Sequence, residues 1–390
     1  MVHRVAVMLC LGVMACVGTT FGGCTGSAER IGSEDAAVSP QDAQGMTDVR
    51  LPDAQVADGS AQDGSTPTDA APPVGQTLSE RYPNDAWDTA DPAILFATDF
   101  ETDESGLALS SYTGDRAEVL QAADLSANGS GSLRLSFTLG RLRNGGTASA
   151  QANVRFPLPP TRTYYVRFYQ RYGAGTARPH HGSGTRVHAE GADRGGTAGI
   201  RPDGNERFNT RIDLDGQDRQ FFYTYWHEMR SGRCNDGSAV PGCAGDQGST
   251  YYFGNRFRPA DQRPVDRFEW ACYEYQVRAN RPNEYDGALL LWTDDELVGR
   301  FETGSPLGQW LRDNFYTMGE FGTEPTTPFE GFNFRSSDGV DQVRVTFEIY
   351  QEQRTLENNR DDTPNKAEQQ AVFFDDIVIA TERIGCRVDR

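Results

Sequence analysis

Lysine is nearly absent from this 390-residue sequence: Lys366 is the only one. Positive charge as a whole is scarce, because 56 acidic residues outnumber 37 lysines and arginines and leave a formal net charge of −19. No basic tract offsets this excess, which argues against nucleic acid as a partner. Any chemistry that needs a lysine must therefore be missing or be carried by another residue.

Long hydrophobic runs are equally rare, and the clearest one covers residues 5–17, directly after His3 and Arg4. The run is too short to span a bilayer, and basic residues followed by an apolar stretch are typical of a secretion signal. A buried N-terminal helix is the alternative interpretation. We expect residues 1–23 to be a signal peptide.

This signal ends in Phe-Gly-Gly-Cys at 21–24, which resembles the lipobox of bacterial lipoproteins. The resemblance implies that Cys24 is lipidated and becomes the mature N-terminus. Cys16 is a competing site, and secretion without a lipid is the other alternative. We predict an exported protein of the outer membrane or cell surface that meets the membrane only through a lipid anchor.

Aromatic side chains are missing from residues 25–78, where nine acids face only two arginines. Such a segment cannot bury enough apolar surface to offset the entropy of ordering its chain, and its charge keeps it extended. We therefore expect 24–81 to be a disordered acidic tether and 82–390 to be one domain.

Cysteine is sparse in that domain, where Cys234, Cys243, Cys272 and Cys386 are the four that remain. An even number of cysteines in an exported protein predicts disulfides. Of the three possible pairings we favour Cys234–Cys243 together with Cys272–Cys386. A zinc site is the alternative, although no C-x₂-C spacing supports it.

From residue 82 onward, dense aromatic residues and short alternating runs are separated by clusters of Gly, Pro, Asn and Asp, a pattern typical of β-strands. The predicted strands are 94–100, 132–139, 148–156, 163–172, 185–190, 206–214, 220–228, 267–278, 288–293, 296–301, 329–334, 342–350 and 372–380. Only 306–315 suggests a turn or two of helix. Many strands without interleaved amphipathic helices predict an all-β fold, a two-sheet antiparallel sandwich.

Segments between residues 132 and 380 resemble, in order, the concanavalin A-like jelly roll of polysaccharide lyase family 14, the alginate-lyase-like proteins. They are SLRL at 132–135, YYVRF at 164–168, WACYEYQVR at 270–278, DGALLLW at 286–292 and FFDDIVI at 373–379. The resemblance implies a jelly-roll fold and an extracellular polysaccharide as partner.

In that family the active residues lie on one sheet: a lysine on one strand, a serine and an arginine two apart on the next, and a Tyr-x-Tyr further along. The positions that match here are Asn209 with Arg211, and Tyr223 with Tyr225. Asparagine thus replaces the serine, and the lysine is missing from its expected strand.

The alternation of side chains along a strand leads to a similar set without the resemblance, because residues two apart share a face. The candidates on this face are Arg211, Tyr223, Tyr225, Asn209 and His188 for catalysis, and Arg186, His227 and Arg256 for substrate binding. Polar residues at these positions predict an open face, with Phe222 and Trp226 packing inward.

Such a face suits β-elimination in a uronic-acid polymer. Arg211 with Asn209 could bind and neutralise the sugar carboxylate, which makes the neighbouring C5 hydrogen more acidic. Tyr223 or Tyr225 could transfer protons, and a histidine of near-neutral pKa is an alternative base. This chemistry requires no cofactor.

Three other functions remain open. A carbohydrate-binding surface protein could use the same aromatic rings and arginines without catalysis. A glycoside hydrolase would need paired carboxylates, for which Glu228, Glu269 and Glu274 are available on predicted strands. A structural envelope protein would bind no ligand.

Acidic residues also cluster in the first and last predicted strands, at Asp99, Glu101, Asp375 and Asp376. If these strands lie side by side, the carboxylates could hold a structural Ca²⁺. The alternative is a solvated or hydrogen-bonded strand end. Elsewhere we interpret 213–216 as a hairpin turn rather than a calcium loop, and His180-His181 as part of a mobile loop.

Overall fold

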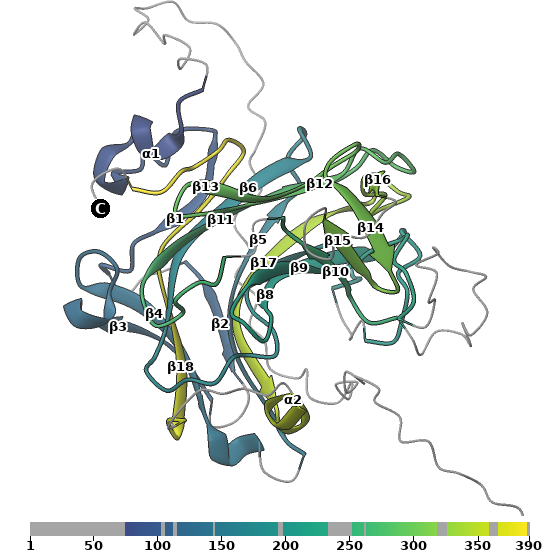
Figure 1. The fold of residues 1–390 in the computed structure, drawn as a ribbon. Coiled ribbons are helices and arrows are strands. Elements are labelled where there is room, and N and C mark those ends of the chain that lie inside the picture. Colours follow the sequence, from purple (N-terminus) through teal and green to yellow (C-terminus); the bar gives the residue numbers. More distant parts are fainter. Residues whose placement is uncertain are drawn as a thin grey trace, which may run out of the picture. The chain divides into compact units, whose positions relative to one another are not determined.

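The computed structural model describes residues 75–102, 106–111, 115–142, 145–193, 198–232, 252–260, 263–317, 326–358 and 366–387 (Figure 1). The predicted signal peptide, the lipidation site at Cys24, nearly all of the tether and the predicted Cys234–Cys243 pair lie outside these residues. None of the described helices is long and apolar enough to cross a membrane.

The first of two β-sheets, sheet A, has the order β13-β12-β11-β6-β18-β4-β3, and β1 also pairs with β18. Its strands are β1 (Ile94–Thr98), β3 (Arg116–Gln121), β4 (Gly131–Thr138), β6 (Thr163–Tyr172), β11 (Ala271–Arg278), β12 (Ala288–Thr293), β13 (Glu296–Phe301) and β18 (Gln369–Ala380). All of these pairings are antiparallel.

The second sheet, sheet B, has the order β16-β14-β15-β10-β9-β8-β7-β17-β5-β2. Its strands are β2 (Ala108–Ser111), β5 (Thr147–Pro157), β7 (Gly184–Ala189), β8 (Arg207–Leu214), β9 (Gln220–Tyr225), β10 (Asn255–Arg258), β14 (Leu307–Leu311), β15 (Asn314–Thr317), β16 (Thr327–Pro328) and β17 (Val340–Glu352). One pair, β10 with β15, is parallel, so the sheet is mixed rather than wholly antiparallel.

The two sheets form the layers of a jelly-roll sandwich and share one apolar core (Figure 1). Phe168 of β6 packs edge-on against Phe347 of β17, with ring centroids 5.5 Å apart, and against Phe374 of β18 at 5.7 Å. Side chains alternate between the two faces of a strand. Because Phe347 points toward sheet A, the residues next to it in β17 point away from sheet A. The predicted all-β sandwich is confirmed.

Short helices complete the fold: α1 (Leu78–Arg81), η2 (Pro83–Asp85), η3 (Ala123–Leu125), η4 (Leu139–Leu142) and α2 (Gln353–Asn358). α1 belongs to the fold, because Leu78 is fully buried beside Val378 and Ile384 in a second, smaller apolar cluster. The Leu78 N–H also donates to the carbonyl of Arg383 at 3.0 Å. The ordered domain therefore begins before residue 82.

The prediction of a helix at 306–315 was wrong. β14 and β15 form an antiparallel hairpin there, in which Trp310 lies opposite Phe315. Arg312 has a φ of 56° at the tip, a turn conformation that a helix excludes. The backbone at Gly308 lies so close to the ring of Phe315 that a Cβ at this position would come within 2.5 Å of a ring carbon.

The prediction of a strand at 329–334 was also wrong. Phe329, Phe332 and Phe334 are fully buried and pack on one another, but the segment makes only an isolated bridge between Phe332 and Gly287. The aromatic residues that suggested a strand are explained by core packing alone.

The predicted disulfide Cys272–Cys386 is confirmed, with an S–S distance of 2.02 Å. It links β11 to the C-terminal segment, and the two cysteines are 114 residues apart. Cross-linking over so long a loop removes much conformational entropy from the unfolded chain.

Replacing both cysteines, Cys272→Ser with Cys386→Ser, should therefore lower the free energy of unfolding by about 4–5 kcal/mol. Urea denaturation followed by tryptophan fluorescence measures the loss. The matched double variant Cys234→Ser with Cys243→Ser opens a much shorter predicted loop and should lose less. Equal midpoints for the Cys272/Cys386 variant and the unchanged protein would contradict this prediction.

Candidate functional site

Alternate residues of β7, β8 and β9 point away from sheet A, onto a surface that we name the outer face. Within the hydrogen-bonded register, Arg186 lies opposite Asn209, and Asn209 lies opposite Tyr225. Arg211 is two residues further along β8, on the same face, and lies opposite Tyr223. Directly opposite residues of paired strands have neighbouring side chains on one face. The structure thus brings these five candidates together.

Two further candidates lie on the same face. Arg256 of β10 is opposite Tyr223, and His188 of β7 is opposite Arg207. The outer face therefore combines cationic, amide, phenol and imidazole groups over four adjacent strands.

His227 does not belong to this arrangement. β9 ends at Tyr225, and the chain turns immediately afterwards, with the Met229 N–H donating to the Trp226 carbonyl at 3.2 Å. The His227 ring instead lies against Gly204 and beside Glu228, with 3.6 Å between Nε2 and Oε1. The alternation that placed His227 with the tyrosines fails because the strand is shorter than predicted.

His188 is held in one tautomer. Its Nδ1 lies 2.9 Å from the carbonyl oxygen of Ala189, and a carbonyl can only accept, so Nδ1 carries the hydrogen. Nε2 is buried and has no hydrogen-bond partner. Burial also lowers the pKa of His188, which favours the neutral ring. The result is an imidazole whose Nε2 lone pair can accept a proton.

The expectation of an open face was wrong for the central residues. Tyr225 is 3 % exposed, Asn209 5 %, and Tyr223 and His188 are both 6 % exposed. The backbone of Gly254 lies directly on the ring of Tyr223, where a Cβ would come within 2.6 Å of a ring carbon. Residues at these positions are thus covered by neighbouring segments, and the rings of Tyr223 and Tyr225 belong to the apolar core cluster although their strand face points away from sheet A.

Arg211 has a partner that the sequence analysis missed. Its Nη1 donates to Oε2 of Glu348, an outer-face residue of β17, while Ser149 Oγ donates to Oε1 at 3.0 Å. Burial acts to raise the pKa of Glu348, but Arg211 and the other donors outweigh it and lower that pKa. The ion pair fixes the guanidinium, whose side chain remains 24 % exposed.

A second cluster surrounds the two phenols. The Tyr223 and Tyr225 hydroxyl oxygens are 3.5 Å apart, and the His181 ring lies 5.0 Å from the Tyr223 ring. His181 Nδ1 is 2.9 Å from Oδ2 of Asp213, and the Gly182 N–H donates to Oδ1 at the same distance. Burial, together with His180, lowers the pKa of His181. Asp213 is therefore a strand residue that orients His181, rather than part of a turn.

Other outer-face residues could have been found from alternation alone. Arg344 and Glu348 both point to the outer face from β17. Arg155 of β5, opposite Arg344, points to the same face. Both strands were predicted, and alternation places their outward charged residues on the same face as those of β7 and β8. Nothing in the sequence places His181 beside a tyrosine, because its segment carries no strand pattern.

The acidic residues predicted to bind calcium are engaged by the chain itself. Glu101 accepts hydrogen bonds from the Ser130 and Gly131 N–H groups at 2.7 and 2.9 Å, and Asp99 accepts from the Glu101 N–H at 3.1 Å. Among the described residues, no group of three or more His, Cys, Asp or Glu side chains is arranged to hold a metal ion.

The pair in the last strand is similarly engaged. Oδ2 of Asp375 accepts from Ser126 Oγ at 2.7 Å and from the Ala127 N–H at 2.8 Å. Burial raises the pKa of Asp375 to about 6, and burial with the Asp375 charge raises that of Asp376 to about 8. A cation would have to displace these donors, so the residues fit Ca²⁺ poorly, and calcium stays an untested prediction.

Paired carboxylates for glycoside hydrolysis find no support. Glu274 is fully buried in sheet A, where its two oxygens accept from the Ile384 and Gly385 N–H groups at 2.8 and 2.9 Å. Glu228 follows β9 in sheet B and pairs with Arg201. Neither residue faces the cluster of the outer face.

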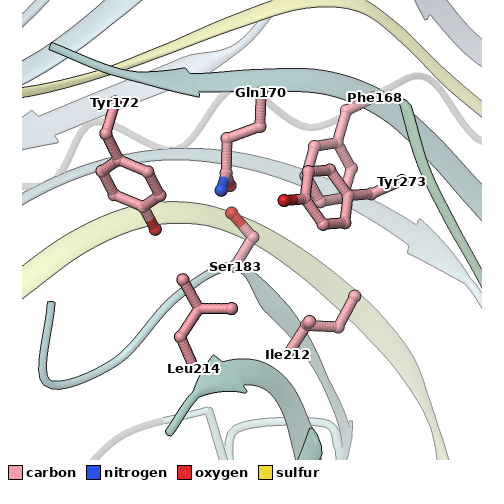
Figure 2. A pocket seen from close by; sticks show the side chains of 7 residues that line it. All are labelled: Phe168, Gln170, Tyr172, Ser183, Ile212, Leu214 and Tyr273. Carbon is pink, nitrogen blue, oxygen red and sulfur yellow. The ribbon is translucent and has the colours of Figure 1, made fainter. Parts of the chain in front are cut away.

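A small cavity lies between the two sheets, on the core side of β8 (Figure 2). Its volume of about 10 Å³ gives room for roughly one water molecule. Figure 2 shows the polar ends of Gln170, Ser183 and Tyr273 directed toward the same space. The complete lining is Phe168, Gln170, Tyr172, Ser183, Ile212, Leu214 and Tyr273. It is separated from the outer face by sheet B and does not form part of the candidate site.

No family model matches the chain, and no curated protein matches it. Among solved structures, the alginate lyase vAL-1 from Chlorella virus is similar over 74 % of this chain and 99 % of its own, with 11 % identity and a TM-score of 0.45. An endo-β-1,4-glucuronan lyase from the fungus Trichoderma reesei is similar over 74 % and 95 %, with 12 % identity and a TM-score of 0.40. The marine PL-14 alginate lyase from Aplysia kurodai is similar over 69 % and 87 %, with 12 % identity and a TM-score of 0.39. Similarities this distant do not transfer an activity to this chain.

Removing the partner of Arg211 should destabilise the fold. Glu348→Gln leaves the mostly buried guanidinium of Arg211 without its counter-charge. We expect the free energy of unfolding to fall by about 3 kcal/mol. This value is at the lower end of the range for buried ion pairs, because Arg211 is partly exposed. Urea denaturation measures this loss. Glu296→Gln is the control: Glu296 and its partner Arg263 are both 62 % exposed, so the expected loss is below about 1 kcal/mol. Similar losses in the two variants would refute a special role for the Arg211–Glu348 pair.

Proposed function

We propose that the protein binds a uronic-acid-containing polysaccharide on the outer face of sheet B and cleaves it by β-elimination. One observation carries this proposal: three hydrogen-bonded strands bring together the groups that the reaction needs. They are the guanidinium of Arg211, the amide of Asn209, the phenols of Tyr223 and Tyr225 and the neutral imidazole of His188.

The first requirement of the reaction is neutralisation of the sugar carboxylate. The hydrogen on C5 is weakly acidic while that carboxylate keeps its full charge, and a guanidinium or amide that binds it stabilises the carbanion-like transition state. Arg211 and Asn209 lie two residues apart on the outer face of β8. Because Glu348 holds Arg211 in place, the guanidinium is oriented before a substrate arrives.

The second requirement is a pair of proton-transfer groups. Nε2 of His188 accepts the C5 hydrogen as a proton, and the electrons of the C5–H bond form the C4–C5 double bond. The C4–O4 bond breaks as this double bond forms, its electron pair goes to O4, and a phenol of Tyr225 or Tyr223 gives its proton to O4. The products are a new chain end bearing a hydroxyl and an unsaturated uronate.

Binding without cleavage is the second candidate function. The two phenols are almost completely covered, and Arg211 already binds an internal carboxylate. Aromatic rings and arginines in this arrangement would serve recognition of an acidic polysaccharide equally well. Retained binding with no unsaturated product is the result that would favour this function.

We also propose that the domain acts outside the cytoplasm, anchored by a lipid on Cys24. The apolar run at 5–17 and the Phe-Gly-Gly-Cys motif support export, and the disulfide Cys272–Cys386 suits an oxidising compartment. The acidic segment that follows Cys24 would serve as the tether.

Activity should depend on the phenol of Tyr225. We expect the purified protein to generate the ultraviolet absorbance of a conjugated unsaturated uronate from polyglucuronate, alginate or polygalacturonate. Tyr225→Phe should lower kcat by about 10²- to 10⁴-fold while binding is retained, since it removes only the transferable proton. Tyr285→Phe, a substitution at an exposed tyrosine, is the control. Unchanged turnover in Tyr225→Phe would remove this tyrosine from the mechanism.

The pH profile should report on His188. Histidine ordinarily has a pKa of 6.5, and burial lowers that of His188, so the ring stays neutral and basic at pH 6.5. We expect kcat/KM to hold as the pH falls to this value and to decline only below it, when Nε2 becomes protonated. His188→Gln should abolish this acid limb, whereas His227→Gln should keep it. An acid limb that persists in His188→Gln would assign it to another group.

A further inference from the structure

Three arginines of the outer face lie directly opposite one another on adjacent strands. Arg155 of β5 is opposite Arg344 of β17, which is opposite Arg186 of β7. The row continues through Asn209 of β8 to Tyr225 of β9. Neighbouring strands are about 4.8 Å apart, so the row crosses the sheet from the arginines directly into the proposed catalytic residues.

The three arginines surround one carboxylate, that of Asp193, which follows β7. Arg155 Nη2 is 2.9 Å from Oδ2, and Arg344 Nη1 is 3.0 Å from each oxygen. Arg186 Nη1 is 3.6 Å from Oδ1 and donates to the Asp193 backbone carbonyl at 2.9 Å. We name these three arginines the arginine cradle. Its geometry is suited to holding a carboxylate.

The cradle has donors that Asp193 does not use. The Nε atoms of Arg186 and Arg344 are buried without hydrogen-bond partners. Burial and the charges of neighbouring arginines lower the pKa of Arg186 to about 9. Clustered cations are stabilised by an anion, even in a chain whose net charge is strongly negative.

The cradle also adjoins the proposed base. His188 Nε2 lies 3.8 Å from Oδ1 of Asp193, which is too far for a hydrogen bond. The two side chains are nevertheless neighbours. A uronate carboxylate in the place of the Asp193 carboxylate would therefore lie beside the proposed base and close to the carboxylate that Arg211 and Asn209 bind.

We infer that the arginine cradle is a carboxylate subsite for the acidic polysaccharide, and that the Asp193 side chain is its internal occupant, which a uronate of the substrate displaces. This inference rests on the proposed function and extends it. It assigns a second carboxylate of the polymer, besides the one bound by Arg211 and Asn209, to Arg155, Arg186 and Arg344, and it makes Asp193 a competitor of substrate. Specificity for a charged over a neutral sugar then arises at this subsite.

Removing the competitor tests the inference. Asp193→Asn keeps the size of the side chain but removes its charge. The control is Glu296→Gln, which removes one negative charge at an exposed position of sheet A. Calorimetry measures the affinity of each variant for a glucuronic acid trisaccharide, a mannuronic acid trisaccharide and neutral cellotriose. If Asp193 fills the cradle in about nine of ten molecules, Asp193→Asn should bind an acidic trisaccharide about tenfold more tightly. Cellotriose binding and the Glu296→Gln variant should show no gain.

A second variant covers the case in which Asp193→Asn does not fold. Arg155→Gln removes one arm of the cradle while Arg344 and Arg186 still hold Asp193, and it should weaken binding of the acidic trisaccharides but not of cellotriose. Circular dichroism and thermal melting check that each variant is folded.

Failure of the inference can be distinguished from failure of the proposed function. Equal or weaker binding of acidic trisaccharides by Asp193→Asn, or an equal gain for cellotriose, would overturn the subsite even if the unchanged protein cleaves its polymer. Tighter binding by Asp193→Asn without any unsaturated product would support the subsite and refute the lyase.

Discussion

Backbone hydrogen bonds of sheet B decide which side chains meet on its outer face, because strand residues alternate between faces and a shift of one residue exchanges them. Val187 and Phe208 point into the core, and their burial fixes the register of β7 against β8. The same register leaves Arg186 beside Asn209. The polar cluster is thus positioned by the apolar packing on the other side of the sheet.

Charge is arranged locally in a way that the net charge conceals. On the outer face, Asp193 contacts Arg155 and Arg344, and Glu348 contacts Arg211. Arginine suits this role better than lysine, because its planar fork can bind carboxylate oxygens in pairs and keeps its charge when buried. A protein almost without lysine can therefore still gather several guanidinium groups on one face of a sheet.

The residue pattern of a segment reports whether its side chains are buried more directly than it reports the hydrogen bonds of its backbone. The aromatic residues at 329–334 are buried as their pattern indicates, but they make no ladder. The hairpin of β14 and β15 looks helical in sequence because Trp310 and Phe315 both face the core from two short strands. His227 was assigned to a face of a strand that ends before it.

The sequence by itself determined the all-β sandwich and the shared face of Asn209 with Arg211, since these follow from alternation and aromatic spacing. The cysteine count predicted disulfides, and the structure selected the pair Cys272–Cys386. Only the tertiary structure decided what covers and charges that face. The contacts of Glu348 with Arg211, and of Asp193 with the arginine cradle, join residues more than a hundred positions apart or on loops without periodicity. Such contacts depend on which strands become neighbours, and no local pattern encodes that choice.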